Sequence, residues 1–239
     1  MSPKISHSTL AVLGIFLILP TLGCVGESKG ASRKPSLGSA PPAVDAQTTP
    51  LKIRVTVQNS TGDNALSPFI VALHSPEQTL FQLGMPASTG LARVAETGDT
   101  SVLEPELDML NIMHVKAPGD PIPAGATRSA EFTIDPVALQ GTRLSLVSMI
   151  GRSNDSFVAL EGIELSQVKM GRLVLDARNY DAGSEENTGN VGDFGPGGHP
   201  TTHAENLVSV DRGLNLRGDA PENWGWGETA ARVTIELVP

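Results

Sequence analysis

Residues 51–58 read LKIRVTVQ, and this stretch decides the fold class. Apolar Ile53, Val55 and Val57 alternate with polar residues, which is the pattern of a strand that buries one of its two faces. The same alternation returns in RVTIEL at residues 232–237. We therefore expect a domain that starts and ends in strands.

Several apolar runs between these two stretches also predict strands. They lie at residues 69–75, 129–135, 143–150, 156–160 and 171–177. Turn-forming residues separate them, notably PGDPIPAG at 118–125 and the glycine-rich stretch at 183–198. Helical periodicity is confined to 87–97 and 100–111. This pattern predicts an all-β fold, an antiparallel β-sandwich with one or two short helices in its connecting loops.

The first residues of the chain have the layout of a secretion signal. An uncharged run, TLAVLGIFLIL at 9–19, follows Lys4 and precedes the small residues that end at Cys24. The run is about half as long as the ~20 apolar residues of a membrane-spanning helix. We therefore predict a signal peptide over residues 1–23.

Cys24 is the only cysteine of the chain, and it follows a glycine, as in the lipobox of bacterial lipoproteins. Thr21 and Pro20 depart from that pattern. We predict lipidation at Cys24 and an extracytoplasmic location as a bacterial outer-membrane lipoprotein, since Val25 replaces the aspartate of inner-membrane retention. An ordinary secreted protein is the alternative. A lone cysteine also excludes intrachain disulfides.

Residues 24–50 are rich in proline, serine, glycine and alanine, a composition that does not support a packed core. We expect them to carry the lipid and act as a linker to a domain at 51–239. The formal net charge of −9 disfavours nucleic acid and anionic membrane as ligands. The predicted contact with a membrane is therefore through the N-terminal lipid only.

Acidic residues follow two of the expected strands. Asp155 lies in SNDSFVAL, and Asp181 and Glu185 lie in NYDAGSEEN. A hard cation such as Ca²⁺ is held by six to eight oxygens, which loops at strand ends can supply. Gly183 would allow a tight turn that points both later carboxylates at one centre. On composition alone, solvated loop acids are the more common interpretation.

Three other features have competing interpretations. His199 and His203 are spaced like zinc ligands, but their context is a loop and no glutamate lies between them, which favours ordinary loop histidines. Ser148 lies inside an expected strand, and no G-x-S-x-G motif is present. Trp224 and Trp226 could form a platform for a sugar or a partner, although packing of at least one into the sandwich is favoured.

Four segments resemble the spondin domain, which is known from animal extracellular-matrix proteins and bacterial secreted proteins. They are LFQLGMPASTGLARVAETGD (80–99), LSLVSMIGRSNDSFVAL (144–160), YDAGSEEN (180–187) and WGETAARVTIEL (226–237). The resemblance implies a β-sandwich with Ca²⁺ at one end of its sheets. The implied metal carboxylates are Asp155, Asp181 and Glu185, the last in place of the aspartate of animal members.

Together these features predict a calcium-binding, non-enzymatic binding or adhesion module at the cell envelope. Its partner would be an unknown extracytoplasmic protein or glycan. A purely structural envelope protein is a related possibility. The alternative of another class is a metal-dependent envelope hydrolase that uses the same carboxylates.

Overall fold

The computed structural model describes residues 49–196, 198 and 203–238. Its strands are β1 (Leu51–Asn59), β2 (Ile70–His74), β3 (Met113–Lys116), β4 (Thr127–Ile134), β5 (Arg143–Met149), β6 (Ser156–Glu164), β7 (Arg172–Asp181), β8 (Ser209–Val210) and β9 (Thr229–Val238). Two α-helices, α1 (Thr89–Thr97) and α2 (Leu103–Met109), lie between β2 and β3. Short 3-10 helices occur at Pro136–Leu139, Leu165–Met170, Val191–Asp193 and Glu222–Trp224.

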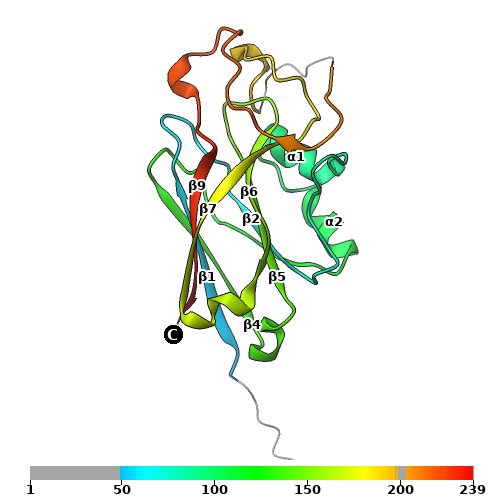
Figure 1. The fold of residues 1–239 in the computed structure, drawn as a ribbon, viewed down its shortest axis with the longest axis vertical. Coiled ribbons are helices and arrows are strands. Elements are labelled where there is room, and N and C mark those ends of the chain that lie inside the picture. The colour runs from blue at the N-terminus through cyan, green and yellow to red at the C-terminus, as the bar shows by residue number, and fades with distance from the viewer. Residues whose placement is uncertain (1–48, 197, 199–202, 239) are drawn as a thin grey trace, which may run out of the picture. The chain divides into compact units, whose positions relative to one another are not determined.

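All strands belong to one antiparallel sheet in the order β3-β2-β5-β6-β7-β9-β1-β4, with β8 paired to β7. The sheet curls into two layers, β3-β2-β5-β6 and β7-β9-β1-β4 (Figure 1). The layers are joined where Ser156–Ala159 of β6 pair with residues 178–181 of β7. The predicted all-β sandwich is confirmed, with its two layers continuous through this junction.

The main hydrophobic core fills the space between the layers. Ile53, Val55 and Val57 of β1 are fully buried, as the sequence alternation predicts. They pack in the same cluster as Leu144 and Leu146 of β5 from the other layer. Burial of such side chains is worth about 1.5–3 kcal/mol each, so this cluster is the main stabilising feature of the fold.

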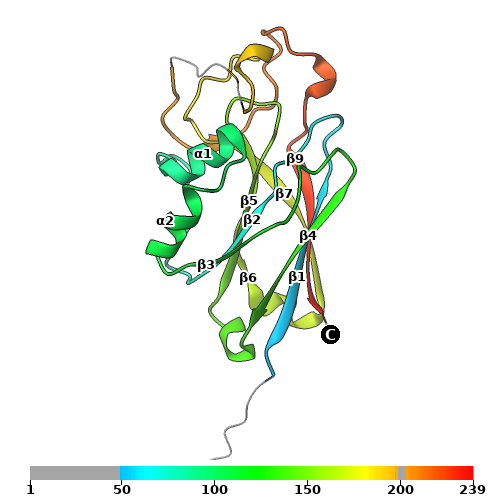
Figure 2. The same cartoon turned by 180° about the vertical axis from the view of Figure 1, so that it is seen from behind.

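The two helices cover the outer face of the layer that contains β2, β5 and β6 (Figure 2). Leu91 and Val94 of α1 join Leu103 and Leu107 of α2 in a second cluster against this face. Every residue of β2 is consequently buried, because the core covers one face and the helices the other. Ser88 caps α1 by accepting a hydrogen bond from the Leu91 amide at 3.1 Å.

Most of the expected elements are confirmed, with shifted ends. The helices expected at 87–97 and 100–111 are shorter in the structure, and the strand expected at 156–160 continues to Glu164. β3 and the two-residue β8 were not predicted from the sequence. β3 has partly exposed side chains on both faces, so its sequence shows no clear alternation.

The predicted signal peptide at 1–23 and most of the linker at 24–50 lie outside the described residues. None of the helices in the described part of the chain is long and apolar enough to cross a membrane.

Candidate metal centre

The strand register brings two of the three predicted ligands to one place. Ser156, the first residue of β6, pairs with Asp181, the last residue of β7. Asp155 directly precedes Ser156 and therefore lies beside Asp181. Both side chains are nearly inaccessible, with exposed fractions of 1% for Asp155 and 8% for Asp181. Two carboxylates are thus buried side by side at one end of the sheet.

The Asp155 carboxylate fastens the turn that follows β7. Its Oδ2 accepts hydrogen bonds from the backbone N–H groups of Ser184 at 2.7 Å and Glu185 at 2.9 Å. The Ser184 hydroxyl donates to the same oxygen at 3.1 Å. The other oxygen, Oδ1, is buried and has no hydrogen-bond partner among the described residues. A buried carboxylate oxygen without a partner is unfavourable unless something absent from the structure completes it.

Gly183 makes this turn possible. Its φ of +69° is a conformation that residues with a side chain rarely adopt, and its N–H donates to Asp181 Oδ1 at 2.8 Å. A Cβ at this position would lie 2.5 Å from the backbone oxygen of Leu207. The glycine therefore lets the 205–208 segment lie directly against the turn.

The charges of the three predicted ligands are poorly compensated. Burial raises the pKa of Asp155 to about 6. Burial, followed by the neighbouring charge of Asp155, raises the pKa of Asp181 to about 7. Burial, together with the charges of Glu96 and Asp155, raises the pKa of Glu185 to about 7. Within the described residues, none of the three forms a salt bridge, so each charged form lacks a cationic partner.

The three carboxylates share a region without forming a finished coordination shell. In the described part of the chain, no group of three or more histidine, cysteine, aspartate or glutamate side chains is arranged to hold a metal ion. The chemistry of the region nevertheless fits a hard cation. Its three carboxylates supply oxygen ligands, one of these oxygens is buried without a partner, and the charges repel one another.

Glu205 belongs to the same acidic region and was not found from the sequence. Its negative charge contributes to the raised pKa of both Asp155 and Asp181. It comes from a segment with no recognisable motif and reaches the region only because 205–208 packs on the turn at Gly183. No sequence pattern indicated this residue.

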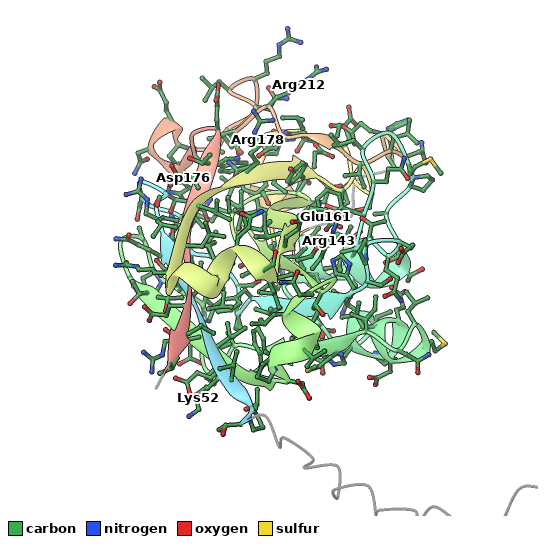
Figure 3. The ribbon with its side chains drawn as sticks, turned by 60° about the horizontal axis from the view of Figure 1, so that its bottom comes forward. Lys52, Arg143, Glu161, Asp176, Arg178 and Arg212 are labelled. Carbon is green, nitrogen blue, oxygen red and sulfur yellow. The ribbon has the colours of Figure 1, made fainter. Side chains whose placement is uncertain are left out.

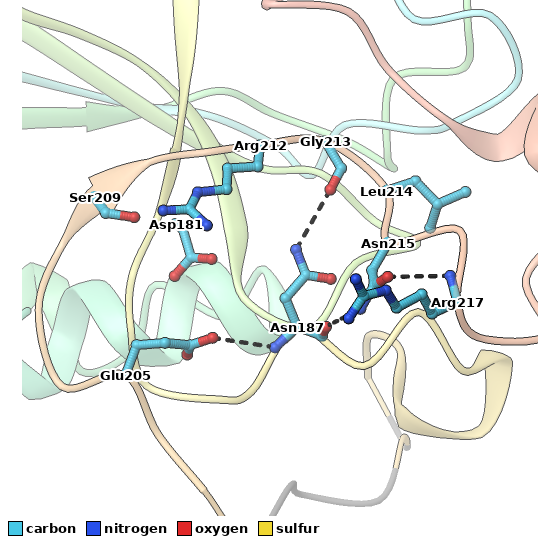
Figure 4. Close-up of a pocket in the computed structure, with 9 residues that line it drawn as sticks. All are labelled: Asp181, Asn187, Glu205, Ser209, Arg212, Gly213, Leu214, Asn215 and Arg217. Carbon is cyan, nitrogen blue, oxygen red and sulfur yellow. Dashed lines mark hydrogen bonds between the residues drawn. The ribbon is translucent and has the colours of Figure 1, made fainter.

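A cavity of about 470 Å³ opens beside Asp181 (Figure 4). Its lining includes Asp181, Asn187, Glu205, Arg212, Asn215 and Arg217. Figure 4 shows Asp181 and Glu205 on one side of the view, Arg217 on the other, and Asn187 between them. Asp155 and Glu185 do not line this cavity.

The cavity lies far from the start of β1. Its lining residue Arg212 is on the opposite side of the molecule from Lys52, which lies near the start of that strand (Figure 3).

The remaining candidates from the sequence are two histidines, Ser148 and two tryptophans. His199 lies outside the described residues, and His203 is exposed with its Nδ1 3.6 Å from Glu186 Oε2. Ser148 is fully buried in β5, as predicted. Trp226 packs against the main core, which confirms that at least one tryptophan is packed, and Trp224 lies under the Arg152 guanidinium at 4.2 Å from the ring centroid.

Comparison with known proteins gives one consistent result. The Spondin_N family model matches residues 58–192, more than half of the chain. Spondin-1 of Rattus norvegicus and of Homo sapiens are each 31% identical to the chain over 135 residues. Spondin-1 of Gallus gallus is 30% identical over 133 residues. The matched region is 51% of this chain and only 16% of the length of each relative.

Proposed function

Because the chain belongs to the Spondin_N family, we propose that it is a calcium-stabilised, non-enzymatic binding module displayed at the cell envelope. Membership of the family supports a binding or adhesion module in general. The calcium and the anchoring are additions that rest on the residues of this chain. The module would bind its partner through the loop end of the sheet, where the acidic region and the cavity lie.

The observation that carries the calcium proposal is the carboxylate of Asp155. One of its oxygens is buried without a partner, while the other is held by the turn that contains Glu185. Asp155, Asp181 and Glu185 would hold the ion, with Glu205 near enough to add negative charge. A bound cation would supply the positive charge that the buried carboxylates lack. It would also tie the 182–185 turn to β6.

Thermal unfolding of the full chain tests the calcium proposal. Calcium at one hundred times its Kd should add about 2.7 kcal/mol of stability, because it binds the folded state and not the unfolded one. For a domain of this size the melting temperature should then rise by about 5–10 °C relative to the chelated protein. The rise should vanish in an Asp181→Asn, Glu185→Gln variant.

A matched control is Asp120→Asn, which removes an exposed carboxylate in a different loop. This variant should keep the full calcium-dependent rise. Identical melting curves for the wild-type chain with calcium and with chelator would refute the calcium site.

Anchoring at the envelope is supported by the sequence before the described residues. The apolar run at 9–19, Cys24 and the linker that follows are the features expected of a lipoprotein. The domain itself needs no membrane contact under this proposal. The lipid would hold it near a surface, and the linker would give it reach.

The hydrolase alternative has one observation in its favour, the concave cavity beside Asp181. Only one of the three proposed metal ligands lines that cavity, and none of the described histidines does. A binding role is therefore the better supported of the two. Turnover of ester or glycoside substrates that requires both a divalent metal and Asp181 would favour the hydrolase instead.

A further inference from the structure

The cavity beside Asp181 has cationic donors that the fold does not use. Within residues 49–196, 198 and 203–238, the guanidinium groups of Arg212 and Arg217 form no salt bridge and no hydrogen bond. Both residues are exposed and line the cavity. Each guanidinium offers five N–H donors in a planar fork that matches a carboxylate or sulfate group. The fold leaves these donors available to an anionic ligand.

The remaining lining residues exclude a simple inorganic anion as the preferred ligand. Asp181 and Glu205 share the cavity with the arginines and would repel an anion that carries no donors. The same carboxylates accept hydrogen bonds from hydroxyl groups. Asn187, Asn215 and Ser209 add further polar groups to the lining. A ligand that satisfies this lining needs both a negatively charged group and several hydroxyls.

The cavity is formed in advance by contacts between its own loops. Asn215 Nδ2 donates to the backbone oxygen of Asn187 at 2.8 Å, and Asn187 Nδ2 donates to that of Gly213 at 3.4 Å (Figure 4). The same two loops also approach closely at Gly189, where a Cβ would lie 1.9 Å from the backbone oxygen of Asn215. Because these contacts already hold the loops in place, less conformational entropy is lost when a ligand binds.

We propose that the cavity between Arg212 and Arg217 binds an acidic saccharide. The guanidinium groups take its carboxylate or sulfate group, and Asp181, Glu205 and Asn187 take its hydroxyls. The cavity of about 470 Å³ lies within the usual range for a small-ligand site. This inference rests on the proposed binding function and names its ligand class.

Calorimetric titration of the full chain in detergent tests the inference. The probes are a uronic-acid tetrasaccharide, a sulfated tetrasaccharide and a neutral tetrasaccharide, each titrated in calcium-containing buffer. The wild-type chain should bind at least one acidic probe, and the one that binds identifies the anionic group. Arg212→Gln and Arg217→Gln should each weaken that binding about tenfold or more, since each removes a charge-assisted contact.

Arg172→Gln is the matched control, because Arg172 is an exposed arginine at the opposite end of β7. It should leave the affinity unchanged. Equal binding of neutral and acidic probes, no binding of either acidic probe, or full affinity in both cavity variants would overturn the inference.

The melting temperature of the same samples, with calcium and with chelator, keeps the two proposals apart. A calcium-dependent rise without saccharide binding overturns the acidic-saccharide site and leaves the calcium site standing. Arginine-dependent saccharide binding without any rise supports the acidic-saccharide site and refutes the calcium site.

Discussion

At the scale of single residues, the proposed calcium site depends on Asp155 and the two oxygens of its carboxylate. Oδ2 holds the 182–185 turn through backbone N–H groups, while Oδ1 is buried without a partner. The same group would therefore fasten the turn and contribute to a cation site. These two roles can be separated by substitution, because asparagine keeps an acceptor oxygen and removes the charge.

Asp155→Asn should retain the stability of the chelated wild-type chain or slightly exceed it, because the variant removes repulsion with Asp181. It should lose most of the calcium-dependent gain. Asp155→Ala should instead destabilise even the chelated chain by about 1–3 kcal/mol, since buried N–H groups lose their acceptor. Urea unfolding with and without calcium measures both effects. Equal stability of the two variants in chelator would contradict the fastening role.

The stability of the chelated chain should fall as pH rises from about 5 to about 8. The pKa of Asp155 is raised to about 6 and that of Asp181 to about 7, above the ordinary value near 4 in the unfolded chain. The folded state therefore holds more protons in this window, so it loses stability as they leave. For these two groups the loss should be on the order of 4 kcal/mol over the window, because the pKa of Asp155 lies about one unit above pH 5 and that of Asp181 about two.

Denaturant midpoints in chelator at a series of pH values measure this slope. An Asp155→Asn, Asp181→Asn variant should have a flatter profile over the same window. Saturating calcium should also flatten or reverse the slope, because the cation favours the ionised carboxylates. A rise in stability between pH 5 and 8 in chelator would contradict the assigned burial of the two charges.

At the scale of elements, the site depends on the end of β7 and the turn that follows it. Gly183 and Gly171 lie just beyond the two ends of this strand, and both have positive φ values. A Cβ on Gly183 would lie 2.5 Å from the Leu207 oxygen, whereas a Cβ on Gly171 would meet nothing within 4 Å. Alanine substitutions at these two glycines therefore distinguish the cost of a positive φ from the cost of a steric clash.

Gly183→Ala should lower the free energy of unfolding by more than Gly171→Ala and should also weaken calcium binding. The Gly171 variant carries only the conformational cost of a positive φ, about 1–2 kcal/mol. Chemical unfolding and calcium titration of both variants test this difference. Equal losses of stability, with calcium affinity unchanged in both, would show that the close approach of Leu207 does not matter.

Elements with one buried and one exposed face are the ones that the sequence predicts best. Ile53, Val55 and Val57 alternate with polar residues because β1 faces the core on one side only. β2 and β5 were predicted from continuous apolar runs, although the sequence did not show that α1 and α2 cover their second face. β3 shows no clear alternation and was missed.

The candidate site could be predicted only where its residues belong to a motif. Asp155, Asp181 and Glu185 stand in segments that resemble the spondin domain, and the strand register places Asp155 beside Asp181. Glu205 and Arg212 come from loops whose positions depend on packing between distant segments. No local pattern in the sequence carries that information, so these residues required the structure.

At the scale of the whole molecule, the proposal joins a loop-end binding site to an N-terminal lipid. β1 starts at Leu51, directly after the linker predicted at 24–50, and its Lys52 lies on the opposite side of the molecule from Arg212 (Figure 3). The described domain therefore begins at the end away from the proposed binding region. This arrangement suits a displayed binding module.

Cys24→Ser should release the protein from the membrane fraction into the soluble extracytoplasmic fraction, because the substitution removes the thiol that would carry the proposed lipid anchor. Detergent-phase partitioning and labelling with a fatty-acid analogue measure the change. The domain should keep its melting temperature. Unlabelled wild-type protein that partitions into the aqueous phase would support the secreted alternative.

Calorimetric titration of the chelator-treated full chain with calcium at neutral pH tests whether Asp155, Asp181 and Glu185 form a calcium site. We expect one calcium ion bound per chain, loss of that binding in the Asp181→Asn, Glu185→Gln variant, and full binding in Asp120→Asn. No calcium bound by the wild-type chain, or the same binding in the double variant, would contradict it.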